Sequence, residues 1–259
     1  MNHRRKRNFL NCSRRSFMLA MLLVIRRGAR RFGVAACAAV AMLAATSAHA
    51  VEDYKVNELV ERARVTLESF NSDQDLQQFR AYVPYAHALL IIPSYVRGAF
   101  WLGIATGMGV VIKRDEATGQ WSSPAFYSLR DVSIGAQFGG SGSEMIVIFQ
   151  TPGSVDLLNR TSVQFGIDAA AAAGNLGYGV EGATQTNMSA DIAAFARSKG
   201  AFMGASVSGS TLVVKHDWNT VYYGRNVAPM DILNGQVSNP AADGLRRAAE
   251  KFFRDNSGR

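Results

Sequence analysis

Side chains that commonly carry out chemistry are sparse in this sequence. Beyond residue 50 the only histidines are His87 and His216, and both cysteines, Cys12 and Cys37, lie before that point. A zinc site needs three or four protein ligands, most often Cys or His. Two histidines far apart in the chain do not supply such a set, so the sequence predicts no metal site and no disulfide beyond residue 50.

Hydrolysis by a serine nucleophile would need one of these histidines beside a serine. No serine stands in the G-x-S-x-G pattern of serine hydrolases, since residues 139–143 read GGSGS. His216 and Asp217 are adjacent, so in a strand they would point to opposite faces. His87 falls in an apolar stretch, where we expect a structural histidine. These features predict that the protein is not an enzyme.

One glycine motif, at residues 177–182, fits the G-x-G-x-x-G pattern of dinucleotide-binding proteins. Such a site also requires a helix directly after the motif. The residues that follow, 183–187, are polar and do not resemble the start of a helix. We therefore interpret these glycines as part of a strand and turn, and we predict no cofactor.

The basic character of the chain is concentrated at its N-terminus. The whole chain has 28 Lys and Arg against 20 Asp and Glu, a formal charge of +8, but residues 1–50 hold ten of the basic side chains and no acid. Residues 51–259 therefore carry a slight acidic excess. Because nucleic-acid binding depends on basic surface that neutralises phosphates, the sequence predicts no nucleic-acid partner.

Residues 1–50 have the pattern of a secretory signal. Arginines within 26–31 precede an Ala-rich apolar run at 34–45, and residues 48–50 (AHA) form the small-x-small pattern that signal peptidase accepts. The apolar run is shorter than the ~20 residues of a membrane-spanning helix. We predict a signal peptide over 1–50, cleavage after Ala50, and a secreted, periplasmic protein that is membrane-associated.

Three features of this leader stay open. A second apolar run at 17–25 makes Met18 or Met21 an alternative start of translation. Residues 13–18 resemble a twin-arginine export signal, and Cys37 stands in a weak lipoprotein box. The sequence does not decide between general and twin-arginine export, or whether Cys37 is lipidated.

Helical periodicity marks both ends of the remaining chain, and a period of two marks its middle. Residues 51–70 and 239–255 space their apolar side chains as helices do, and a short helix is expected within 72–82. In 100–112 bulky side chains alternate with Gly and Ala, which is typical of a strand. Similar alternating strands are expected at 131–138, 163–173 and 201–213.

Two expectations about packing follow from these strands. The glycine-rich turn at 139–143 predicts a hairpin between 131–138 and the apolar run 145–149. Because Gly weakens a strand, its repeated use on one face predicts that a helix or second sheet approaches that face. The sequence thus predicts one α+β domain over 51–259, a curved, largely antiparallel, Gly-rich β-sheet flanked by N-terminal and C-terminal helices.

Several short motifs, taken in order, resemble those of one known family. Residues 199–209 (KGAFMGASVSG), 219–224 (NTVYYG) and 231–235 (DILNG) are similar to segments of SYLF domains, as are 119–126 (GQWSSPAF) and 133–139 (SIGAQFG). SYLF domains are lipid-binding modules. The resemblance therefore implies a bacterial, exported member of the SYLF family, whose partner is a bacterial phospholipid membrane surface.

The side chains expected to contact lipid combine basic and apolar character. Arg246, Arg247 and Lys251 stand beside Phe252 and Phe253 in the C-terminal helix. Anionic headgroups attract such a stripe by roughly 1 kcal/mol per basic residue, and aromatic side chains favour membrane interfaces. The predicted lipid-binding residues are Arg246, Arg247, Lys251, Phe252, Phe253, Trp101 and Lys199.

Two alternatives stay open. Docking of the C-terminal helix onto the sheet would bury Phe252 and Phe253, and the aromatic residues would then be ordinary core. In function, a periplasmic protein-interaction or assembly scaffold, with a protein partner or self-association, is the alternative to phospholipid binding. Lys113 and Arg114 are interpreted as solvated charges at a strand end. The sequence does not identify the lipid, the process or the oligomeric state.

Overall fold

The computed structural model describes residues 52–73, 77–97, 103–133, 143–165, 191–198, 201–205, 207 and 209–258. The chain divides into two units, Met1–Val51 and Glu52–Arg259, and the fold described below is that of the second unit. The predicted signal peptide, the glycine motif at 177–182, Trp101 and Lys199 lie outside the described residues.

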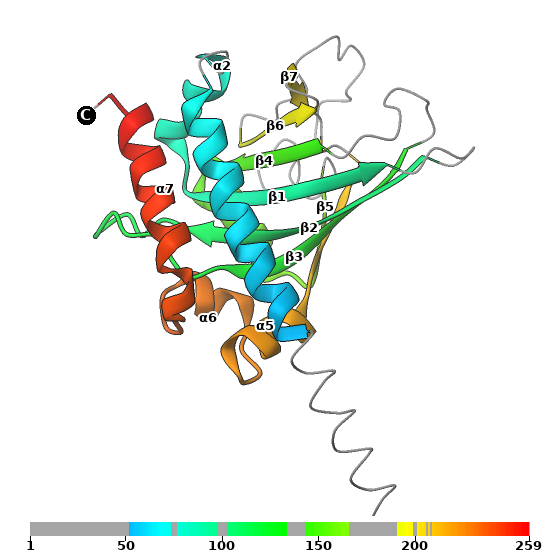
Figure 1. The fold of residues 1–259 in the computed structure, drawn as a ribbon, viewed down its shortest axis with the longest axis vertical. Helices are drawn as coiled ribbons and strands as arrows, with labels where there is room; N and C mark the ends of the chain where they lie inside the picture. Colours follow the sequence, from blue (N-terminus) through cyan, green and yellow to red (C-terminus); the bar gives the residue numbers. More distant parts are fainter. Residues whose placement is uncertain are drawn as a thin grey trace, which may run out of the picture. The chain divides into compact units, whose positions relative to one another are not determined.

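A curled antiparallel β-sheet forms the centre of this unit (Figure 1). Over the described residues it has eight strands in the order β5-β8-β3-β2-β1-β4-β6-β7, and every neighbouring pair is antiparallel. The strands are β1 (Ala88–Arg97), β2 (Gly103–Lys113), β3 (Ala125–Ser133), β4 (Ser143–Phe149), β5 (Ser162–Gln164), β6 (Ile192–Ser198), β7 (Ala201–Ala205) and β8 (Thr211–Val214).

Helices pack on the sheet, which confirms the predicted α+β class. Residues 52–72 form a long helix, drawn in blue, and α7 (Asp243–Asn256) lies beside it (Figure 1). None of the helices within the described residues is long and apolar enough to cross a membrane. The shorter helical elements are α2 (Gln77–Arg80), η1 (Val83–Tyr85), α3 (Pro152–Asp156), η2 (Leu157–Asn159), α5 (His216–Tyr223), α6 (Pro229–Leu233) and η3 (Pro240–Ala242).

The long helix and α7 cover the bulky face of the sheet and not the face of small residues. Val110 and Ile112 of β2 belong to the same buried cluster as Leu67 of the long helix and Leu245 and Phe252 of α7. These two helices therefore do not lie on the glycine face. The helical residues that pack on that face come from the short elements η2 and α6, since Leu158 and Ile232 share a buried cluster with Val111 of β2. The long helix and α7 pack on the bulky face because its large side chains allow more apolar area to be removed from water.

The small residues of β2 accommodate the neighbouring strand instead. The pairing of β1 with β2 shifts register between Ile91 and Ser94, so the chain bulges opposite Gly109. A Cβ atom on Gly109 would lie 2.7 Å from the carbonyl oxygen of Ile91 and 2.8 Å from Cγ1 of Ile92. The close approach therefore comes from β1 itself and not from a second layer.

The other face of the sheet is also buried, because the sheet curls around it. The rings of Phe149 in β4 and Phe165, just after β5, have centroids 6.3 Å apart, although five strand positions separate β4 from β5. The Tyr127 hydroxyl of β3 donates to the Leu158 carbonyl of η2 over 3.0 Å. A second apolar cluster therefore fills the inside of the curl.

The predicted hairpin between 131–138 and 145–149 is wrong. β3 pairs with β2 and β8, whereas β4 pairs with β1 and β6, so two strands separate β3 from β4. All five residues from Met145 to Phe149 are buried. Such a strand is stable only with neighbours on both sides and cover on both faces, which its place between β1 and β6 provides.

Two further local predictions are also wrong. The expected strand at 201–213 is two strands, since β7 pairs with β6 and β8 pairs with β3 and β5. Gly209, with φ of +85°, lies in the turn between them. His216 begins helix α5 and is not in a strand. Asp217 in the first turn favours a helix there, because a carboxylate stabilises the positive end of the helix dipole.

Candidate ligand-binding site

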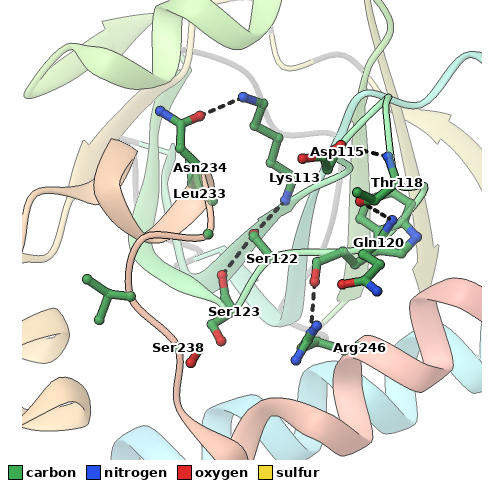
Figure 2. A pocket seen from close by; sticks show the side chains of 13 residues that line it. Lys113, Asp115, Thr118, Gln120, Ser122, Ser123, Leu233, Asn234, Ser238 and Arg246 are labelled. Carbon is green, nitrogen blue, oxygen red and sulfur yellow. Dashed lines mark hydrogen bonds between the residues drawn. The ribbon is translucent and has the colours of Figure 1, made fainter.

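A cavity of about 330 Å³ opens between the β2–β3 connection, the segment that follows α6 and the first turn of α7 (Figure 2). Small-molecule sites in proteins typically measure roughly 300–1,000 Å³, so this cavity can hold a small ligand or a headgroup. The residues that line it are Lys113, Asp115, Thr118, Gln120, Trp121, Ser122, Ser123, Leu233, Asn234, Gly235, Val237, Ser238 and Arg246.

Lys113, the last residue of β2, provides one positive charge in the cavity. Its Nζ donates to Oδ1 of Asn234 over 2.7 Å, and this bond crosses from one wall to the other (Figure 2). Its backbone N–H donates to Oγ of Ser122 over 3.0 Å. The Ser122 hydroxyl in turn donates to the carbonyl of Ser123 over 2.9 Å. These bonds hold the end of β2 against the 121–123 segment.

Arg246, in the first turn of α7, provides a second positive charge. Its Nε donates to the carbonyl oxygen of Trp121 over 2.8 Å (Figure 2), and its Nη1 lies 3.3 Å from Oδ1 of Asp243. The side chain is 29% exposed, so the guanidinium is held by the protein while it still meets solvent. Lys113 and Arg246 are thus both attached to residues 121–123.

Asp115 is the acidic residue among those that line the cavity. Its Oδ1 accepts the backbone N–H groups of Ala117 (2.8 Å) and Thr118 (2.9 Å). These bonds, chiefly that from Thr118, hold the pKa of the Asp115 carboxyl below its usual range. The carboxylate is therefore engaged with its own turn, and the rest of the lining consists of cations, hydroxyls, amides and a few apolar groups. Such a lining suits a small anion.

Helix α5 holds one wall of the cavity in place. The amide oxygen of Asn219 accepts the backbone N–H of Phe126 over 2.9 Å, and the Tyr223 hydroxyl donates to the carbonyl of Pro124 over 2.7 Å. Burial raises the pKa of Tyr223 well above its usual value, so the phenol stays a neutral donor. The motifs at 119–126, 219–224 and 231–235 therefore meet around one cavity.

A second hollow of similar volume, about 330 Å³, lies next to the first. Trp121 borders both hollows. The guanidinium carbon of Arg114 sits 4.1 Å from the centroid of the Phe253 ring, a cation–π contact. Glu250 and Arg254 of α7 complete its charged lining. Two neighbouring hollows, each with cationic side chains, thus lie along α7.

The structure separates the side chains of α7 that were predicted to contact lipid. Arg247 and Lys251 are exposed on α7, and Lys251 is ion-paired with Asp255. Phe252 is 1% exposed and packs against Phe79 in the core. It is therefore not placed for direct contact with lipid, and this fits the docking alternative. Phe253 is half-buried under the guanidinium of Arg114, and Arg246 lines the cavity. The remaining two predicted residues, Trp101 and Lys199, lie outside the described residues.

The sequence alone did not predict the roles of several residues of this site. Lys113 and Arg114 were interpreted as solvated charges, whereas Lys113 lines the cavity and Arg114 covers Phe253. The sequence marks Asn234 only as part of the motif at 231–235. The signal that could have found the cavity was the set of motifs itself, since residues 119–126 and 231–235 form its facing walls.

The histidines are not gathered into a site in the part of the chain that the structure describes. Nδ1 of His87 lies 2.6 Å from Oε1 of Glu116, and His216 is exposed at the start of α5. The described ranges hold no group of three or more His, Cys, Asp or Glu side chains that could bind a metal ion.

The curled antiparallel sheet, the helices packed on it and the polar cavity beside α7 belong to one α+β domain. Residues 130–252 match the sequence model of the Ysc84 family, described as "Las17-binding protein actin regulator". The domain match to the Ysc84, or SYLF, family is thus shown for residues 130–252.

Relatives of the chain come from yeasts and mammals. It is 30% identical over 174 residues to "SH3 domain-containing protein PJ696.02" of Schizosaccharomyces pombe, a match that covers 65% of this chain and 40% of that protein. It is 27% identical over 165 residues to human "SH3 domain-containing YSC84-like protein 1", covering 63% and 48%. It is 28% identical over 165 residues to "LAS seventeen-binding protein 3" of Saccharomyces cerevisiae, covering 62% and 36%. The chain thus spans less than half the length of these curated relatives.

Proposed function

We propose that this domain binds phospholipid at a membrane surface and catalyses no reaction. The observation that carries the proposal is a basic stripe on the exposed side of α7, formed by Arg247, Lys251 and Arg254. These residues stand four and then three positions apart, so they lie along one side of the helix. The opposite side of α7 is buried in the core through Leu245, Ala248, Ala249 and Phe252.

The basic stripe keeps a positive excess despite two acids near it. Asp255 pairs with Lys251 and accepts a hydrogen bond from Asn71 over 2.8 Å, and both contacts hold the pKa of Asp255 below its usual range. Glu250 is the second acid. An anionic membrane attracts each basic side chain near its surface by roughly 1 kcal/mol, so a docked helix with such a stripe is suited to anionic headgroups.

The proposal includes the location of the protein. The predicted signal over 1–50 would export the domain, and the membrane it meets would be a bacterial phospholipid membrane in the periplasm. The cavity with Lys113 and Arg246, beside the basic stripe, supports the same class of ligand.

Flotation of the purified protein without the predicted signal, residues 51–259, with phosphatidylcholine vesicles, with and without phosphatidylglycerol, tests the proposal. We expect binding to the anionic vesicles that weakens as salt rises, because salt screens exposed charges. Replacing Arg247→Gln and Lys251→Gln together should weaken binding roughly thirtyfold, the equivalent of about 2 kcal/mol.

The matched control removes two exposed cations from other elements, Arg62→Gln with Arg225→Gln. This pair gives the same change in net charge, and we expect it to leave flotation nearly unchanged. If both double variants weaken binding to anionic vesicles equally, the net charge of the protein alone drives binding. Absence of flotation under every condition would remove the lipid proposal.

Protein interaction is a second candidate function, favoured by the names of the relatives. The family description and "LAS seventeen-binding protein 3" both refer to binding another protein. Over the described residues β5 and β7 stand at the two ends of the strand order, and the end strand of a sheet is the usual place at which another strand is recruited. Protein interaction would be favoured if the protein does not float with any vesicle and, in solution, either associates with itself or binds a protein partner in a fixed stoichiometry.

A further inference from the structure

The cavity differs from the basic stripe because its two cations are preorganised. Arg246 of α7 is held by the bond from its Nε to the carbonyl of Trp121, whereas Lys113 of β2 is attached to Ser122 through its backbone N–H. Asn234 holds the ammonium group of Lys113 from the facing wall. A site whose charged groups are already fixed loses less conformational freedom when a ligand binds.

Both cations have N–H groups left for a ligand. An ammonium group has three N–H donors and a guanidinium has five. Lys113 uses its Nζ on Asn234, and Arg246 uses Nε on Trp121 and Nη1 on Asp243. In the described part of the chain these side chains have no other partner, so each can still donate to an anion in the cavity.

We propose that this cavity binds the phosphate group of a phospholipid headgroup, with Lys113 and Arg246 as its two cationic contacts. The inference rests on the proposed function and adds the chemical group that the domain recognises. Phosphate oxygens accept charge-assisted hydrogen bonds from both lysine and arginine. The exposed hydroxyl of Ser238 at the wall of the cavity adds a further polar group.

The size and position of the cavity favour a headgroup over a whole lipid. About 330 Å³ lies at the small end of the range of ligand sites, so acyl chains would remain outside. Arg246 directly precedes Arg247, the first residue of the basic stripe. A headgroup held in the cavity would therefore keep its lipid next to the stripe that contacts the surface.

A phosphate monoester should bind more tightly than a diester, because it carries more charge and more terminal oxygens.

Two probes separate recognition of the headgroup in the cavity from attraction of the basic stripe to the membrane surface. The first is glycerol 3-phosphate, which has the headgroup phosphate and no acyl chains, titrated while the amide signals of Ser122, Ser123 and Asn234 are followed by NMR. The second is flotation with phosphatidylcholine vesicles that contain either phosphatidic acid or phosphatidylglycerol at matched surface charge.

The variants Lys113→Gln and Arg247→Gln give opposite patterns if the inference is correct. Lys113→Gln should weaken glycerol 3-phosphate binding roughly ten- to a hundredfold and abolish the preference for phosphatidic acid, while salt-sensitive binding to phosphatidylglycerol persists. Arg247→Gln should leave glycerol 3-phosphate binding intact and weaken flotation with both lipids equally. Should Lys113→Gln fail to fold, Ser238→Tyr narrows the cavity without removing a charge and should give the same loss.

Each other outcome overturns one statement or both. Flotation without a glycerol 3-phosphate response and without a preference for phosphatidic acid rejects the cavity but leaves the proposed function standing. A response to glycerol 3-phosphate without flotation on any vesicle identifies a soluble phosphate ester as the ligand, which rejects a lipid for both. If glycerol 3-phosphate causes no change in the amide signals and the protein floats with no vesicle, both proposals are rejected.

Discussion

Asn219 shows how one polar side chain can organise the site from inside the core. It is fully buried, and its amide oxygen accepts the backbone N–H of Phe126 at the start of β3. Ser122 and Ser123 of the cavity wall lie in the segment that leads into this strand. Buried polar groups are nearly always hydrogen-bonded, and this bond satisfies the amide oxygen of Asn219 while it positions the strand.

Replacing Asn219→Ala should lower the free energy of unfolding by roughly 1–3 kcal/mol, because the buried N–H of Phe126 loses its acceptor. Urea denaturation measures the change. Asn226→Ala, at an exposed position after α5, is the control and should alter stability by less than about 0.5 kcal/mol. Similar stability of both variants would show that the Phe126 N–H does not depend on Asn219.

At this scale the sequence predicted single residues only where a local pattern contained them. Arg246 was predicted because it lies in a basic, helical stretch, and the structure places it in the cavity. Lys113 and Asn234 meet across 121 positions of chain, and no local pattern contains both. Phe252 and Phe253 are neighbours in sequence, yet helical geometry buries the first and leaves the second half-exposed.

At the scale of elements, β1 and β2 fit together only because β2 has glycines where β1 bulges. The sequence correctly predicted the helices at both ends and the alternation of 103–112, because periodicity is a local property. It did not predict that β4 leaves β3 to join β1, or that 201–213 supplies two separate parts of the sheet. Strand order depends on contacts between distant segments, which periodicity does not encode.

Replacing Gly109→Ala should destabilise the protein by roughly 1–3 kcal/mol, the usual cost of forcing an extra group into a packed interior. The added Cβ would lie 2.7 Å from a backbone oxygen of β1, which cannot move without breaking the pair of strands. Thermal and urea unfolding would measure the loss.

Gly244→Ala in α7 is the matched control. Its Cβ would approach only the flexible side chain of Arg64, at 3.2 Å, and alanine favours a helix over glycine by roughly 1 kcal/mol. We expect unchanged or slightly raised stability. If Gly109→Ala were equally harmless, the bulge of β1 would have to be more adaptable than its packing indicates.

At the scale of the whole molecule, the sheet separates two apolar clusters, and both contain buried tyrosines. Burial raises the pKa of the phenols of Tyr127, Tyr222 and Tyr223 well above their ordinary value. Tyr127 belongs to the cluster inside the curl, and Tyr222 to the cluster under the helices. Ionisation of these phenols is therefore opposed on both sides of the sheet.

This burial predicts a loss of stability in alkali. In the unfolded chain a tyrosine ionises near pH 10, whereas the folded pKa is higher. The contribution of each buried phenol to the free energy of unfolding is therefore fully present below about pH 10. It is lost as the pH rises above that value, by up to about 1.4 kcal/mol per pH unit for each tyrosine. Urea denaturation at a series of pH values would measure the slope.

Tyr127→Phe should reduce this slope, because one buried phenol is removed. Tyr54→Phe, at a side chain that is 68% exposed, should leave it unchanged. Identical slopes in the two variants would mean that Tyr127 does not titrate on unfolding.

The place of β8 in the sheet has a consequence for how the protein reaches its native state. β8 closes one flank of the sheet by pairing with β3, although β3 ends at Ser133 and β8 begins at Thr211. Pairings between such distant segments raise the contact order, and proteins dominated by them acquire their structure slowly. Until β8 arrives, an edge of β3 stays open to other chains. The protein should therefore be most prone to aggregation while it refolds from denaturant, and dilution should raise the yield of native material.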